Sequence, residues 1–91
     1  MIGRFLRLNR IKANLTQHDV AQHLAYTSPQ FVSNWERGVS LPPLEVLPKL
    51  SHLFGIAPKE IIETLERYQE AVMKRKRKML ADMFKKESKK A

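Results

Sequence analysis

The apolar residues of this chain recur mostly at steps of three and four, the spacing that places side chains on one face of an α-helix. The first row has one imperfect member, Asn9, and consists of Ile2, Phe5, Leu6, Asn9 and Ala13. It predicts a helix from Ile2 to Ala13. Asn14 follows and is one of the few non-glycine residue types that tolerate left-handed backbone, so we expect the helix to stop there.

The stretch from Thr16 to Gly38 predicts two short helices joined by a tight turn. Thr16 is a good N-cap, and Asp19 can bond back to it in a capping box. The second helix has Ser28 as its cap and a proline at its first position, where the missing N–H does no harm. Gly38 can take the positive φ that ends a helix. The inner faces carry Val20, Ala21 and Leu24 in the first helix and Val32 and Trp35 in the second.

The outer face of this second helix is polar, because Gln30, Ser33, Asn34 and Arg37 fall at i, i+3, i+4 and i+7. Gln and Asn amides match the N6/N7 edge of adenine, Ser can donate or accept, and Arg can reach guanine or a phosphate. An ordinary solvated face would more often carry Glu and Lys, which are stronger helix formers. The row therefore favours contact with base pairs, and a plain solvated face is the alternative.

Two further helices are predicted after a proline-containing loop. One spans Leu44 to Phe54, with Pro48 tolerated close to its first turn and Gly55 closing it. The other opens at Pro58, a favourable first residue, and its apolar positions continue far enough to carry it to about Lys86.

This last helix would be about 43 Å long at 1.5 Å per residue, which is more than a small four-helix domain can cover. We expect its uncovered apolar positions to form a seam with a second subunit, although they are not a regular heptad. They are Tyr68, Val72, Met79 and Met83. A bend near Arg75 that folds the last turns back is the alternative. The run KRKRK at residues 74–78 is either a solvated basic tail, an arm that contacts phosphates or, least favoured, a membrane-surface helix.

The composition suits a single small domain with an anionic partner. Among 91 residues there are 17 Lys and Arg against nine Asp and Glu, a net charge of +8, and 11 of those 17 lie after Ala57. The absence of cysteine excludes disulfides and thiolate-rich zinc sites. No apolar run approaches the ~20 residues of a membrane span, and the N-terminus does not resemble a signal peptide. We expect a cytoplasmic protein without membrane contact.

No set of residues predicts catalysis, a metal or a cofactor. His18 and His23 are five residues apart and diverge by about 140° around a helix, and His52 has no carboxylate partner nearby in the sequence. The three glycines are too scattered for a phosphate-binding loop, and the acidic residues suit caps and solvated faces. We expect neither an enzyme nor a small-molecule ligand.

Several of these residues together resemble one known family. Thr16-Gln17, the pair Ala21 and Leu24, and VSNWERG at residues 32–38 are similar to the helix-turn-helix of the lambda-repressor-like, XRE-type family. The likeness extends from about Ile2 to Ile62. Ala25 stands where the family usually has Gly, and the segment from Leu24 to Val32 is one residue longer. This departure predicts either a wider turn or a longer preceding helix.

The resemblance implies an all-α, five-helix, lambda-repressor-like domain over residues 1–66. Because the uncovered apolar positions lie after it, we expect residues 67–91 to be a basic C-terminal extension for dimerisation. It also implies that the helix Ser28–Arg37 lies in the major groove of double-stranded DNA. We expect base contacts from Gln30, Phe31, Ser33 and Asn34, and phosphate contacts from Gln17, Ser28 and Arg37. In the family, the residues matching Arg10 and Glu36 form an ion pair.

Taken together, these expectations describe a dimeric repressor that reads a palindromic operator with half-sites ~34 Å apart. Activation, an antitoxin role, a phage repressor and a restriction controller fit the same residues. The alternative from another class is a protein-interaction module that docks a toxin or a polymerase subunit, with DNA binding secondary. The polar character of Gln30, Ser33 and Asn34 disfavours it.

Overall fold

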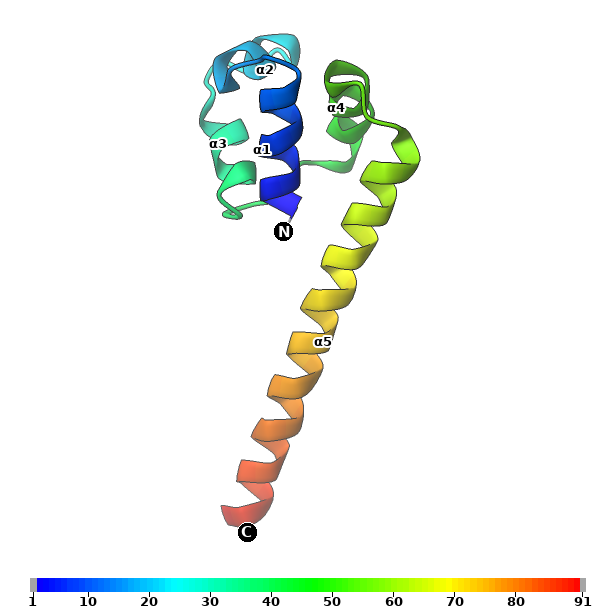
Figure 1. The fold of residues 1–91 in the computed structure, drawn as a ribbon. Coiled ribbons are helices and arrows are strands. Elements are labelled where there is room, and N and C mark those ends of the chain that lie inside the picture. The colour runs from blue at the N-terminus through cyan, green and yellow to red at the C-terminus, as the bar shows by residue number, and fades with distance from the viewer. Residues whose placement is uncertain (1, 91) are drawn as a thin grey trace.

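The computed structural model describes residues 2–90, and this part of the chain is all-helical (Figure 1). Its five α-helices and one 3₁₀ turn are α1 (Ile2–Lys12), α2 (Gln17–His23), α3 (Gln30–Glu36), η1 (Leu44–Val46), α4 (Leu47–Phe54) and α5 (Pro58–Lys90). The predicted all-α fold of five helices with an extended last helix is confirmed. Among the described residues, none of these helices is both long enough and apolar enough to cross a bilayer.

The ends of the helices follow the predicted local chemistry. Thr16 Oγ1 accepts from the Asp19 N–H at 3.0 Å and Asp19 Oδ2 accepts from the Thr16 N–H at 2.9 Å, which completes the capping box. Asn14, Gly38 and Gly55 follow α1, α3 and α4, and all three have positive φ. These stops keep the helices short, so that the connecting loops can bring them round one core.

The start of α3 differs slightly from the prediction. The helix begins at Gln30 instead of Pro29, although Pro29 already has helical backbone angles. Ser28 still serves the helix end, because its Oγ accepts from the Gln30 N–H at 3.1 Å.

The turn between α2 and α3 keeps a left-handed residue without glycine. Ala25 has φ of 59°, a conformation that costs a non-glycine residue about 1–2 kcal/mol. Because α2 ends at His23 and α3 begins at Gln30, the extra residue lies in the connection, so of the two predicted alternatives the structure has the wider turn and not the longer helix.

The core lies where α1, α2, α3 and α4 converge. Leu50 and Val20 are its largest fully enclosed side chains. Around them pack Ile2, Leu6, Ala21, Leu24, Val32, Trp35 and Val46. The helix α1 contacts α3 as well as α4 and α5, and α3 and α5 lie on opposite sides of it (Figure 1).

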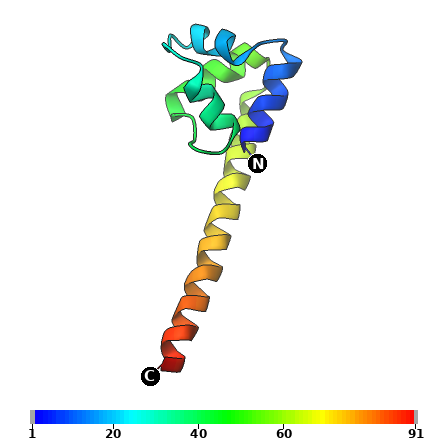
Figure 2. The ribbon, with the colours of Figure 1, turned by 90° about the vertical axis from the view of Figure 1, so that its left-hand side faces the viewer.

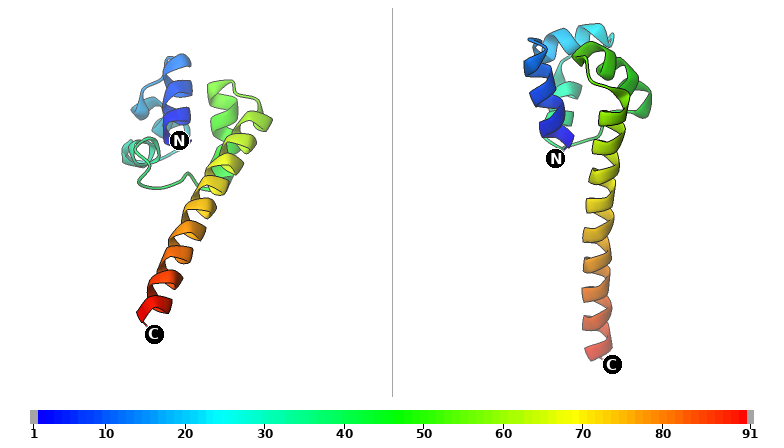
Figure 3. Two further views of the ribbon diagram at one scale, coloured as in Figure 1. Left: turned by 60° about the horizontal axis from the view of Figure 1, so that its bottom comes forward. Right: turned by 45° about the vertical axis from the view of Figure 1, so that its right-hand side comes forward.

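The long helix α5 is one straight rod of 33 residues, so the bend considered near Arg75 does not occur (Figure 3). It also runs on to Lys90, past the expected end at Lys86. Its first turns pack on the domain through Ile61, Thr64 and Leu65. From residue 73 to residue 89 every residue is exposed.

Two of the residues expected to be uncovered are in fact covered by the protein's own domain. Tyr68 packs against the core, and Val72 is half-buried beside the loop that follows α3. The prediction that they stay uncovered is wrong, because the first turns of α5 pack on the domain as far as these two residues. Met79 and Met83 are about 60% exposed, as expected.

Candidate nucleic-acid interface

The helix α3 presents its polar face to the outside. Val32 and Trp35 are each only 3% exposed and hold the opposite face in the core. Gln30 and Arg37 are exposed, and Ser33 and Asn34 between them are half-buried. Figure 2 views the domain from the α3 side, where α5 leaves the domain below it. The helix α5 therefore does not cover the row, and a duplex has access to it.

The polar row is linked by hydrogen bonds centred on Asn34. Its Oδ1 accepts from Gln30 Nε2 at 2.9 Å and from an Arg37 terminal nitrogen at 2.8 Å. Both lone pairs of that oxygen are thus engaged. The two bonds order three long polar side chains before any partner binds, which lowers the conformational entropy that binding must remove.

An aromatic cluster supports the first turn of α3. The ring of Tyr26 lies 5.1 Å from that of Phe31 and 5.8 Å from that of Trp35, measured between centroids. Phe31 remains 52% exposed, so the ring edge away from Tyr26 is accessible. Sequence reasoning missed Tyr26, because a single aromatic residue in a turn has no periodic partner. Its position directly after the left-handed Ala25 places it over α3.

An ion pair joins α1 to the end of α3. Arg10 Nε and its terminal nitrogen contact the two carboxylate oxygens of Glu36 at 2.6 and 3.0 Å, in the bidentate geometry of strong pairs. The side chains are only 12% and 5% exposed. Arg10 also donates to the Leu15 carbonyl at 2.9 Å, and Gln17 Nε2 donates to Glu36 at 3.0 Å. Three helices are thereby held in one orientation.

A close backbone approach fixes the same end of α3. Gly3 is buried in α1, and a Cβ placed on it would lie 2.5 Å from the Glu36 carbonyl oxygen and 2.6 Å from that of Trp35. Only glycine permits this separation of α1 and α3. The sequence carried no signal for this role, because a glycine near the start of a helix does not reveal what it faces.

The three residues expected to contact phosphates are Gln17, Ser28 and Arg37. Gln17 begins α2 and is half-buried, with one amide hydrogen on Glu36 and the other still able to donate. Ser28 accepts a bond from the Gln30 N–H, and its hydroxyl hydrogen can still donate. Arg37 uses one of its five N–H groups for Asn34. All three residues therefore retain donors for an anionic oxygen.

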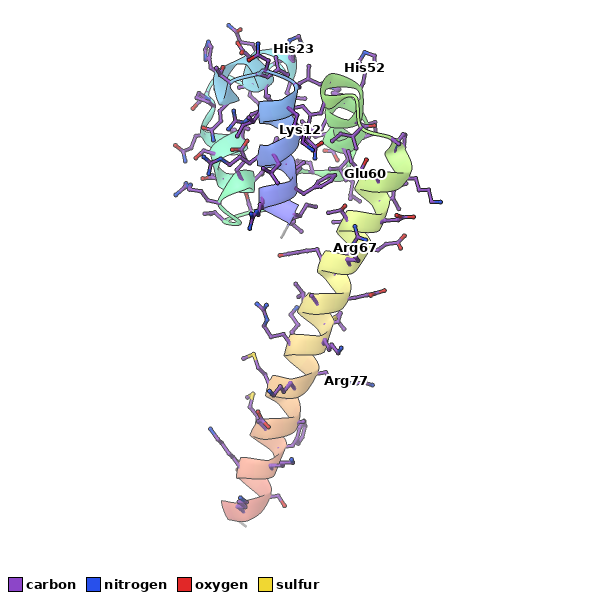
Figure 4. The ribbon with its side chains drawn as sticks, in the orientation of Figure 1. Lys12, His23, His52, Glu60, Arg67 and Arg77 are labelled. Atoms are coloured by element: carbon purple, nitrogen blue, oxygen red, sulfur yellow. The ribbon has the colours of Figure 1, made fainter. Side chains whose placement is uncertain are left out.

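The other titratable groups offer no metal centre. Among residues 2–90 no three His, Cys, Asp or Glu residues converge. His23 and His52 line a shallow hollow together with Lys49 at the top of the domain, away from the row on α3 (Figure 4).

Hydrogen bonds from the backbone and side chain of Thr16 lower the pKa of the Asp19 carboxyl below 3.8, which reflects its role in the capping box.

These features define a helix-turn-helix protein of the type that places a recognition helix against DNA. A helix-turn-helix family model matches residues 6–61, more than half of the chain, and the chain belongs to this XRE-type, lambda-repressor-like family. It is accordingly a DNA-binding transcription regulator, and its partner is double-stranded DNA. No curated protein and no solved structure matches the chain significantly.

Proposed function

We propose that this protein is a dimeric repressor that reads a palindromic operator by inserting α3 into the major groove of each half-site. The observation that supports this most directly is the hydrogen-bonded row of Gln30, Asn34 and Arg37 on the outer face of a helix whose other face is buried. Two-fold symmetry of the protein then requires two half-sites related by the same axis, one helical turn or ~34 Å apart. Repression follows by steric exclusion of other proteins from the operator.

In this proposal Gln30 and Asn34 read base edges, and Ser33 between them contacts either partner of a base pair. Asn34 must exchange at least one of its two internal bonds for an adenine, because a bidentate contact needs its carbonyl oxygen as acceptor. Gln30 has no such restriction on its own carbonyl oxygen. The exposed edge of Phe31 supplies an apolar surface for a thymine methyl group.

Register on the duplex comes from Gln17, Ser28 and Arg37, which donate to phosphates on either side of the groove. The helix α5, from residue 67 onward, supplies the dimer contact through apolar side chains that the domain leaves exposed, Met79 and Met83 among them. A dimer is also what a palindromic operator requires, since one copy of α3 covers only one half-site.

Selection of bound duplexes from a random DNA pool tests the proposal. The parent chain should yield a palindrome, and Gln30→Ala should relax the base preference at one position of each half-site. Arg37→Ala should weaken binding on all sequences alike and reduce the salt slope by about one. Gln22→Ala, which truncates an exposed amide on α2, is the matched control and should leave both properties unchanged.

Asn34→Ala should cost about 1–3 kcal/mol on the selected site and much less on random duplexes. An equal loss on both kinds of DNA would show that Asn34 does not read bases. Failure of the parent chain to enrich any sequence would refute the operator-reading function itself.

A further inference from the structure

The distal half of α5 carries an exposed apolar surface that nothing within residues 2–90 covers. Met79, Leu80, Met83 and Phe84 are between 52% and 73% exposed and lie on adjacent turns, and we call them the distal apolar face. Four large apolar side chains clustered on a helix surrounded by water mark a contact site, unlike single exposed ones. Figure 3 shows that this part of α5 lies beyond the domain in both views.

A complementary hollow exists at the other end of the same helix. Between α4 and the first turns of α5 lies an apolar groove of about 380 Å³, which we call the α4–α5 groove. Its lining includes Leu44, Leu47, Pro48, Ile61, Ile62 and Leu65. Leu44 is 70% exposed and Ile62 is 54% exposed, so the domain does not fill the groove with its own side chains.

The charge of α5 changes sign along its length. Residues 58–73 contain two Lys or Arg against four Asp or Glu, a net charge of −2, and residues 74–90 contain nine against two, a net charge of +7. Two copies of α5 packed in parallel would bring the two +7 halves together. Packed helices are only 8–10 Å apart, a distance at which physiological salt does not fully screen the repulsion. An antiparallel pair instead sets each +7 half beside a −2 half.

We propose that two copies of this chain pair antiparallel along α5, with the distal apolar face of each copy seated in the α4–α5 groove of the other. The inference rests on the dimer of the proposed function and specifies how that dimer is built. It is an isologous two-fold contact, because the same two surfaces of each copy meet twice.

The sequence of α5 also defines the register. Ile62 lies eleven residues before Met73 and Phe84 lies eleven residues after it, and eleven residues return to the same helix face within about 20°. With Met73, which is 64% exposed, at the two-fold axis, Phe84 of one copy meets Ile62 of the other. The same register sets Lys59 opposite Glu87 and Glu70 opposite Lys76, so charges of opposite sign face each other at both positions.

Cysteine cross-linking tests the arrangement, and the cysteine-free chain provides a clean background. Under mild oxidation, Ile62→Cys mixed with a mass-tagged Phe84→Cys chain should form the mixed disulfide dimer. Met73→Cys should cross-link to itself, and Phe84→Cys alone should not. A parallel pair gives the opposite pattern, with Phe84→Cys linking to itself and no mixed product, and this result would overturn the proposal.

Sedimentation of two charge variants tests the contact surface. Leu80→Glu places a carboxylate on the distal apolar face and should raise the dimer dissociation constant by about tenfold or more. Ala81→Glu adds the same charge to the neighbouring exposed position, about 100° around the helix, and should change the constant by no more than about twofold. Equal effects would overturn the proposal, as would a parent chain that stays monomeric and binds anionic phospholipid vesicles through α5.

The two proposals fail separately in these experiments. Antiparallel cross-links in a protein that selects no palindrome would refute the operator-reading function but support the antiparallel pairing of α5. A selected palindrome together with a Phe84→Cys chain that cross-links to itself would refute the antiparallel pairing of α5 but support the operator-reading function.

Discussion

Removing either member of the Arg10–Glu36 pair should destabilise the domain far more than removing an exposed ion pair. The two side chains are 12% and 5% exposed, and their bidentate contacts are 2.6 and 3.0 Å long. Stranding one buried charge costs about 3–5 kcal/mol, a large share of the ~5–14 kcal/mol expected for a chain of this length. Arg10→Ala should cost more than Glu36→Ala, because Glu36 is the more buried of the two and would retain only the bond from Gln17.

The measurement is urea unfolding followed by far-UV circular dichroism. The chain provides its own control in Lys59 and Glu63, an i,i+4 pair at 3.9 Å whose side chains are 86% and 50% exposed. Glu63→Ala should cost less than about 0.5 kcal/mol. The double variant Arg10→Met/Glu36→Leu should recover most of the lost stability, since no unpaired charge remains. The reasoning is refuted if the free energy of unfolding of Arg10→Ala lies within about 1 kcal/mol of that of Glu63→Ala.

Three further predictions follow from the backbone and the caps. Gly3→Ala should lower the free energy of unfolding by about 1–3 kcal/mol, because its Cβ would lie 2.5 Å from the Glu36 carbonyl oxygen. Helix propensity alone would make the substitution stabilising, so a rise in the free energy of unfolding measured in urea would contradict the close contact. Ala25→Gly should raise the melting temperature by relieving a φ of 59°, and Asn14→Gly, at φ of 58°, should gain less because Asn tolerates that region; equal gains would contradict this. The capping box stabilises the fold while Asp19 is ionised, and its pKa is lowered in the folded state, so this contribution is present above pH 3.8 and is lost as the pH falls further. The difference in stability between the parent and Asp19→Asn should therefore shrink on acidification, and a difference that does not change with pH would disprove the assignment.

Much of the local structure was readable from the sequence, because it depends on residues only a few positions apart. The capping box of Thr16 and Asp19 and the positive-φ stops at Asn14 and Gly38 all lie where local chemistry predicts them. The polar row on α3 was also predictable, since three- and four-residue spacing decides which side chains share a helix face. The sequence by itself therefore determined the helices and the chemistry that α3 presents.

Only the tertiary structure decided the contacts between residues that are far apart in the chain. No periodicity shows that Gly3 meets the end of α3, that Tyr26 packs on Phe31, or that Gln17 shares Glu36 with Arg10. The same limit explains the error at Tyr68 and Val72. The apolar positions along α5 do not show where the domain ends, and only the packing of the first turns of α5 on the core determines which of these residues are covered.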